Sequence, residues 1–197
     1  MLCYTFGMPT TLGIRRRRQL SQLGIGMPGD NSHILNIARR LRELVDAAVI
    51  GGIAVFLHGG GRSTVDLDLY ASDQKATSEQ LKKAGAIWDP GAREYLLDGV
   101  RIHLVTPQDT GITISTTSTI DGVRVVTLKD IVAIKLTCGL ENPGRHRDIG
   151  DVEDLIRAVP LDKRFAARLP KSIRSEFKAL VDGVRQGEKR GPENRRF

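Results

Sequence analysis

Residues 49–70 constrain the fold of this 197-residue chain more than any other stretch. Two apolar residues precede the pair Gly51-Gly52, and the apolar run 53–57 follows it, which indicates a short buried helix starting at the glycines. Glycine at a helix start lets backbone N–H groups approach an anion closely, and the helix dipole favours a phosphate there. The glycine pair is therefore a candidate phosphate-binding site.

Residues 65–69 alternate strictly between apolar and acidic side chains, which predicts a β-strand. The two-residue period places Asp66 and Asp68 on one face and the apolar side chains on the other. Two neighbouring carboxylates repel each other, so we expect a cation between them. Carboxylate oxygens suit Mg²⁺ or Mn²⁺, and two such ions about 3.5–4 Å apart support in-line phosphoryl transfer. The plain alternative is a solvated edge-strand face beside an ordinary glycine turn.

Together these residues resemble the signature of the DNA polymerase beta-like nucleotidyltransferase superfamily. The resemblance is carried by Gly-Gly-x-Ala from Gly51, His-Gly from His58 and Arg-x-Thr-x-Asp-x-Asp from Arg62. It looks most like the small bacterial branch of minimal nucleotidyltransferases and AbiEii-type toxins, and it covers about residues 49–159. The resemblance implies magnesium-dependent transfer of a nucleoside monophosphate from a nucleoside triphosphate, ATP among them, to a hydroxyl acceptor.

The resemblance also implies roles for residues beyond Asp66 and Asp68, the expected metal ligands. Arg62, Ser63 and Thr64 lie in the loop before the acidic strand and would bind the triphosphate.

Lys135 and the segment from Arg147 to Asp151 are similar to a Lys followed by Arg-Asp-x-x-Asp in the toxin-like branch. Lys135 would neutralise charge on the transferred phosphates, and Asp151 would hold it in place. The alternative is that these residues have only structural roles. Lys135 would then pack its aliphatic chain on the core and extend its ammonium to solvent, and Asp148 and Asp151 would cap a helix.

Superfamily members usually carry a third carboxylate on the strand beside the acidic strand. The predicted neighbouring strand, residues 101–105, places His103 at that position. Imidazole is a poor ligand for Mg²⁺, but neutral histidine serves as a general base near pH 7. Three outcomes follow: His103 is the base, Asp109 replaces the missing carboxylate, or transfer is lost.

The whole pattern predicts an α/β (α+β) nucleotidyltransferase fold with a mixed sheet covered by helices. We expect an irregular segment at 1–30, a catalytic domain at 31–160, and a C-terminal helix with a basic tail at 161–197. Asn31 or Ser32 would cap the first helix, Thr77 to Gln80 would open a second, and Asp148 would cap a later one. The predicted strands and later helices are 86–89, 93–97, 100–105, 112–117, 123–126, 128–138, 148–159 and 172–186, with hairpin turns at Asp98-Gly99 and Asp121-Gly122.

The net charge of +7 is concentrated at the two ends, since residues 1–30 and 185–197 each carry +3 and leave +1 for the rest. These basic ends would bind RNA or would simply be solvated segments. Cys3 and Cys138 are too few for a disulfide framework, and no apolar run approaches the ~20 residues that span a bilayer. We therefore expect a reduced, cytoplasmic protein with no membrane partner. Translation from Met27 would remove most of the first segment.

The leading hypothesis is a metal-dependent nucleotidyltransferase whose acceptor is a tRNA end or a protein side chain, with a cognate antitoxin as partner. One rival is a nucleotide-binding protein of the same fold that has lost transfer. Another is a small-molecule (antibiotic) nucleotidyltransferase. The sequence does not determine the nucleotide base preference or the oligomeric state.

Overall fold

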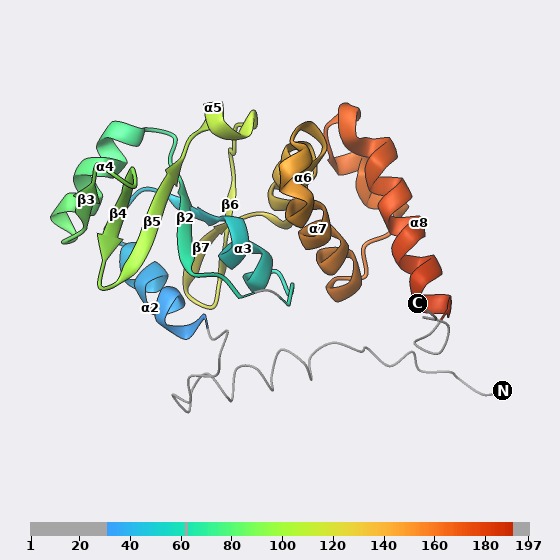
Figure 1. Ribbon diagram of the computed structural model, residues 1–197, viewed down its shortest axis with the longest axis horizontal. Coiled ribbons are helices and arrows are strands. Elements are labelled where there is room, and N and C mark those ends of the chain that lie inside the picture. The colour runs from blue at the N-terminus through green and yellow to red at the C-terminus, as the bar shows by residue number, and fades with distance from the viewer. Residues whose placement is uncertain (1–30, 62, 191–197) are drawn as a thin grey trace.

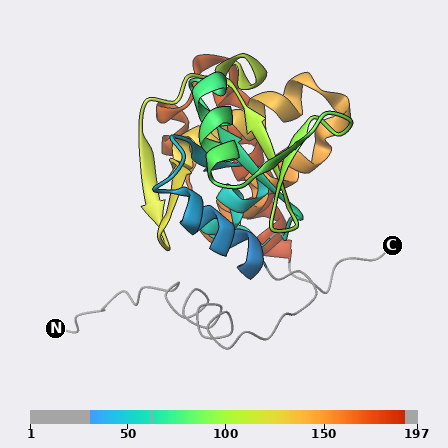
Figure 2. The ribbon, with the colours of Figure 1, turned by 90° about the vertical axis from the view of Figure 1, so that its left-hand side faces the viewer.

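The computed structural model describes residues 31–61 and 63–190, and its strands form one mixed sheet (Figure 1). The strand order is β3-β4-β5-β2-β1-β7-β6, so the β3–β4 and β6–β7 hairpins lie at opposite edges (Figure 2). The described strands are β1 (Ala48–Ile50), β2 (Asp66–Tyr70), β3 (Ile87–Asp89), β4 (Glu94–Leu97), β5 (Val100–Val105), β6 (Thr117–Ile120) and β7 (Val123–Val126). The prediction of a mixed α/β sheet is confirmed.

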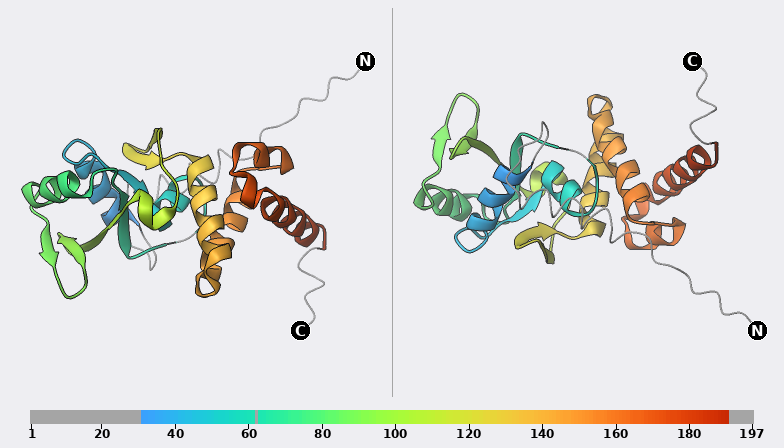
Figure 3. Two further views of the ribbon diagram at one scale, coloured as in Figure 1. Left: turned by 90° about the horizontal axis from the view of Figure 1, so that it is seen from above. Right: turned by 90° about the horizontal axis from the view of Figure 1, so that it is seen from below.

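Some helices lie against the sheet, and others form a separate group at one end of the molecule (Figure 1). They are α2 (Ser32–Leu41), α3 (Gly51–Leu57), α4 (Gln74–Lys83), α5 (Pro107–Thr110), α6 (Leu128–Glu141), α7 (His146–Ala158) and α8 (Arg174–Arg190), with 3-10 turns η1 (Pro143–Arg145), η2 (Lys163–Arg168) and η3 (Lys171–Ile173). Helix α2 packs on β2 and β7, whereas α6, α7 and α8 group together at one end of the molecule (Figure 3). Helix α6 contacts both α3 and α7, and so joins this group to the sheet.

Strand β2 runs through the middle of the sheet, parallel to β5 and antiparallel to β1. Asp68 lies opposite Ile50 on β1 and opposite His103 on β5. Leu67 and Leu69 are 0% and 3% exposed, because they point into the core on the other face. The predicted separation of acidic and apolar faces is therefore confirmed.

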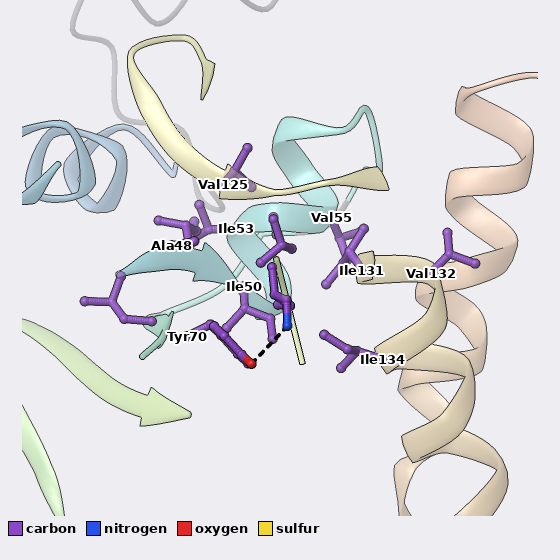
Figure 4. Packing of buried hydrophobic residues seen from close by; sticks show 14 of the residues in the cluster. Ala48, Ile50, Ile53, Val55, Tyr70, Val125, Ile131, Val132 and Ile134 are labelled. Atoms are coloured by element: carbon purple, nitrogen blue, oxygen red, sulfur yellow. Dashed lines mark hydrogen bonds between the residues drawn. The ribbon is translucent and has the colours of Figure 1, made fainter. Parts of the chain in front are cut away.

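The core beside the site is formed where α3 and α6 meet the sheet (Figure 4). Ile53 and Val55 of α3 are fully buried, as are Val125 of β7 and Ile131 of α6. Each such side chain contributes about 1.5–3 kcal/mol relative to an exposed one. The short helix α3 is stable because of this packing, since seven residues are too few to form an isolated helix in water.

Tyr70 closes the end of β2 against the loop before β6. Its hydroxyl donates to the Ile112 carbonyl at 3.1 Å. It also accepts from the Ile114 N–H at 3.1 Å, the hydrogen bond drawn as a dashed line in Figure 4. Residues 112–116 are consequently an ordered loop, and the predicted strand 112–117 is wrong except at Thr117. The loop pairs with a side chain instead of a neighbouring strand, which sequence alternation does not reveal.

Both predicted hairpin turns are present, and α2 holds them. Asp98 and Asp121 each adopt a φ of +49°, as the tight turns require. The guanidinium of Arg40 binds the Asp98 carboxylate at 2.6 Å, and Arg39 Nε donates to the Asp121 carbonyl at 2.8 Å. The basic residues Arg39 and Arg40 of α2 therefore bind two turns of the sheet.

The predicted start of the first helix is confirmed, since α2 begins at Ser32, but two other predicted helix starts are wrong. Asn31 precedes α2 but makes no side-chain cap, and Ser32 already lies inside the helix. Asp73 caps α4 by accepting from Ala76 N–H at 2.9 Å, so that helix begins before Thr77. Helix α7 begins at His146, and Asp148 lies within its first turn.

Among the described residues no helix is both long enough and apolar enough to cross a membrane. The predictions for residues 1–30, including the irregular segment and a start at Met27, lie outside the described residues, as does the tail from residue 191.

Candidate active site

Asp66 and Asp68 project together from the open face of β2, and both are partly buried. The Oδ1 atom of Asp66 is buried and has no hydrogen-bond partner within the described structure. A buried carboxylate oxygen without a partner is costly, and native proteins rarely leave one without a bound cation or donor. The pair therefore fits a divalent cation, which would satisfy this oxygen.

Gly51 is required by the position of the Asp68 carboxylate. It has a φ of +67°, and a Cβ there would lie 1.9 Å from Asp68 Oδ2. The close approach expected at the glycine pair is thus made by the carboxylate of Asp68. Phosphate binding by Gly51 and Gly52 stays a prediction.

Burial raises the pKa of the Asp68 carboxyl, and the hydrogen bond from His103 only partly offsets this effect. Desolvation disfavours the charged form of the carboxylate. A cation bound beside Asp68 would stabilise that charged form.

The loop before β2 is positioned by the residue that precedes α2. Asn31 is 2% exposed, and its Oδ1 accepts the Thr64 N–H at 3.1 Å. Thr64 in turn lies against Gly52, where an added Cβ would be 3.0 Å from the Thr64 Cβ. Ser63 is exposed and Arg62 is outside the described residues. Triphosphate binding by Arg62, Ser63 and Thr64 stays a prediction.

His103 occupies the predicted position beside Asp68, with a carboxylate at each ring nitrogen. Nδ1 lies 3.3 Å from Asp68 Oδ1, and Nε2 lies 2.7 Å from Glu94 Oε2. Burial lowers the pKa of His103, but the hydrogen bonds to Glu94 and Asp68 outweigh it and the net shift is upward. The imidazole ring is therefore fixed between β4 and β2.

Glu94 is the site residue that sequence reasoning missed. It is 9% exposed, and only its position across the sheet brings it to His103. The two-residue turn at Asp98-Gly99 contained the necessary signal, because it pairs Leu97 with Val100 and Tyr95 with Ile102. One further step along both strands brings residue 94 opposite residue 103.

The Asp109 carboxylate caps the short helix α5. Its Oδ2 accepts from Thr106 N–H at 2.8 Å and from Thr106 Oγ1 at 2.7 Å, which completes a capping box at the start of α5. These hydrogen bonds lower the pKa of the Asp109 carboxyl. The structure thus explains Asp109 as a cap and leaves His103 in the third position.

Lys135 is a buried cation held by two carboxylates. It is 6% exposed, and its Nζ lies 2.5 Å from Asp148 Oδ1 and 2.9 Å from Asp151 Oδ2. Arg145 Nε adds a contact of 2.6 Å to Asp148 Oδ2. The expected contact with Asp151 is confirmed, and the alternative of a solvent-reaching ammonium is wrong. Lys135 is also near enough to Asp68 for its charge to lower the pKa of that carboxyl.

The other histidines in the matching region have structural or surface positions. His58 Nε2 lies 2.8 Å from the Val126 carbonyl, and His146 is exposed at the start of α7. Across residues 31–61 and 63–190, no group of three or more His, Cys, Asp or Glu side chains is arranged to hold a metal ion. Two carboxylates with substrate phosphates are nevertheless a usual Mg²⁺ environment.

Comparison with known proteins gives structural neighbours only. No family model matches the chain, and no curated protein matches its sequence. The fold is similar to that of JHP933 from Helicobacter pylori, with a TM-score of 0.50 and 14% identity over 80% of this chain and 90% of that one. It is equally similar, at a TM-score of 0.50 and 14% identity, to a "putative nucleotidyltransferase" from H. pylori, covering 80% of this chain and 93% of that one. The chain therefore has a nucleotidyltransferase-like fold.

Proposed function

We propose that the protein is a metal-dependent nucleotidyltransferase that moves a nucleoside monophosphate from a nucleoside triphosphate to a hydroxyl acceptor. The observation that carries this proposal is the pair Asp66 and Asp68, with the buried, unpartnered Oδ1 of Asp66, on a nucleotidyltransferase-like fold. A solvated edge-strand face would not bury an oxygen in this way, and β2 lies in the middle of the sheet.

Asp66 and Asp68 would hold Mg²⁺ or Mn²⁺, which in such sites neutralises phosphate charge and orients the transferred group. His103 lies beside Asp68, where it would accept the proton of the attacking hydroxyl. The acceptor oxygen then bonds to the α-phosphorus, the bond to the bridging oxygen breaks, and pyrophosphate leaves. Lys135 would add fixed positive charge behind Asp68, with Asp148 and Asp151 holding it in place.

The acceptor is proposed to be RNA, such as a tRNA end, or a protein hydroxyl, as in the AbiEii-type toxin branch that the sequence resembles. A cognate antitoxin would then be the partner, and the cytoplasm the compartment. The test incubates the protein with each labelled nucleoside triphosphate, Mg²⁺ and total cellular RNA or protein. Label in one fraction, lost with Asp66→Asn, supports the proposal. Label in neither fraction from any nucleotide contradicts it.

A second candidate is a nucleotide-binding protein without transfer. It is favoured by one observation: His103 stands where a third carboxylate is usual. Calorimetry with Mg²⁺ and each triphosphate separates the two functions. Binding without pyrophosphate release in the presence of the acceptor fractions supports the second candidate.

A further inference from the structure

Glu94, His103 and Asp68 form a line of hydrogen-bonding groups across three adjacent strands. Glu94 lies at the start of β4, His103 on β5 and Asp68 on β2. The sequence separates Glu94 from Asp68 by a helix and a hairpin, so the sheet register alone brings the three together.

The two contacts of His103 are unequal. Nε2 to Glu94 Oε2 is 2.7 Å, a normal length for a charge-assisted hydrogen bond, whereas Nδ1 to Asp68 Oδ1 is 3.3 Å. A carboxylate accepts but does not donate, and neutral imidazole carries one N–H. In the neutral ring the shorter contact therefore places the single hydrogen on Nε2, and Nδ1 donates to Asp68 only when the ring carries a second proton.

We propose that Glu94 is a positioning residue, which fixes the orientation and Nε2–H tautomer of His103 so that Nδ1 faces the Asp66–Asp68 site. This inference rests on the proposed function, because it assigns Glu94 a task only if His103 takes part in transfer. Metal-ligating and catalytic histidines commonly depend on such a carboxylate, whose loss costs about 10–100-fold in activity or affinity.

The burial of Glu94 supports this role. Its side chain is 11% exposed, and its other oxygen, Oε1, lies 3.6 Å from Arg101 Nε. Arg101 is 61% exposed in its side chain, so this second contact is weak and leaves His103 as the main partner. A buried carboxylate that is held mainly by one imidazole restricts that ring more than a solvent-exposed carboxylate would.

The first test reads the tautomer directly and needs no turnover. Long-range ¹H–¹⁵N spectra of the full chain, at a pH where His103 is neutral, report which ring nitrogen carries the proton; His103→Asn assigns the signal. We expect the Nε2–H form in the wild type and in Glu94→Gln, which keeps an acceptor oxygen. We expect mixed tautomers in Glu94→Leu. An Nδ1–H form in the wild type, or a Glu94→Leu spectrum identical to the wild type, would overturn the proposal.

The second test is a double-mutant cycle on transfer. Glu94→Leu should lower kcat by about 10–100-fold with KM for the triphosphate changed less than about twofold, and Glu94→Gln should recover most of kcat. In a His103→Asn background, Glu94→Leu should have no further effect on kcat. An equal loss in both backgrounds means that Glu94 acts independently of His103. A wild type without any transfer counts against the proposed function alone, because the tautomer measurement still decides the role of Glu94.

Discussion

Two pairs of carboxylates in the described structure have opposite surroundings. Asp148 and Asp151 on α7 are buried, and Lys135 neutralises them together with Arg145. Asp66 and Asp68 on β2 lack a bound lysine or arginine in the described structure, and one Asp66 oxygen is buried without a hydrogen bond. This difference supports the proposal that the Asp66–Asp68 pair holds a cation from outside the chain, whereas the α7 pair binds Lys135 of α6.

The largest expected effect is a loss of stability when Asp148 and Asp151 lose Lys135. Lys135→Met leaves two buried carboxylates without their cation, and removing one partner of a buried ion pair costs about 3–5 kcal/mol. Urea unfolding should show that loss. Lys82→Met is the control, because Lys82 of α4 has a side chain 50% exposed and pairs at 2.9 Å with Glu79, whose side chain is 56% exposed. Its removal should cost less than about 1 kcal/mol. Equal losses from the two variants would remove the contrast between the pairs.

A second variant tests how β2 keeps its pair in position. Gly51→Ala puts a methyl group where Asp68 Oδ2 lies, at a φ of +67° that non-glycine residues rarely adopt. We expect a loss of about 1–3 kcal/mol in unfolding free energy and a smaller rise in Tm on adding Mg²⁺. Gly183→Ala, in an open position of α8, should be neutral or stabilise by about 1 kcal/mol. A Gly51→Ala protein with unchanged stability and Mg²⁺ response would show that the position of the Asp68 carboxylate does not depend on a glycine at residue 51.

The sequence predicted the features that depend on local spacing but not those that depend on long-range contacts. The alternation around Asp66 and Asp68 and the glycines before α3 depend on local spacing, and the strand, its faces and the helix start were predicted. The burial of Lys135 and the approach of Glu94 to His103 depend on packing between distant segments. Local periodicity carries no information about such contacts, except where a tight turn such as Asp98-Gly99 fixes a register.

Asn31 offers a smaller test of the loop that leads to β2. Asn31→Ala removes the acceptor of the Thr64 N–H, which should cost about 1 kcal/mol. The triphosphate KM should rise more than kcat falls, because the loop and not the carboxylates is disturbed. Asn36→Ala is the control, since Asn36 is exposed on α2 and accepts from Arg39 of the same helix at 2.8 Å. If the two variants have the same KM, Asn31 does not position the loop.

The smallest effect concerns pH and the end of α3. Burial lowers the pKa of His58, and the hydrogen bond to the Val126 carbonyl only partly opposes this. The neutral form is therefore favoured in the fold, so its contribution to stability is complete above about pH 6.5, the usual histidine value, and is lost as the pH falls through the lower folded value. The wild type should lose more unfolding free energy than His58→Gln between pH 8 and pH 5. Parallel losses in the two proteins would mean that His58 is not the group responsible.

The most direct measurement of the central claim is calorimetric titration of Mn²⁺ into the wild type and into Asp66→Asn, with Asp46→Asn as a control on an exposed carboxylate. Circular dichroism of each variant verifies that the fold is intact. The wild type and Asp46→Asn should bind Mn²⁺ with equal affinity, and Asp66→Asn should bind at least about tenfold more weakly. Equal Mn²⁺ affinity in the wild type and Asp66→Asn, or no binding to the wild type, would contradict the assignment of this pair as a cation site.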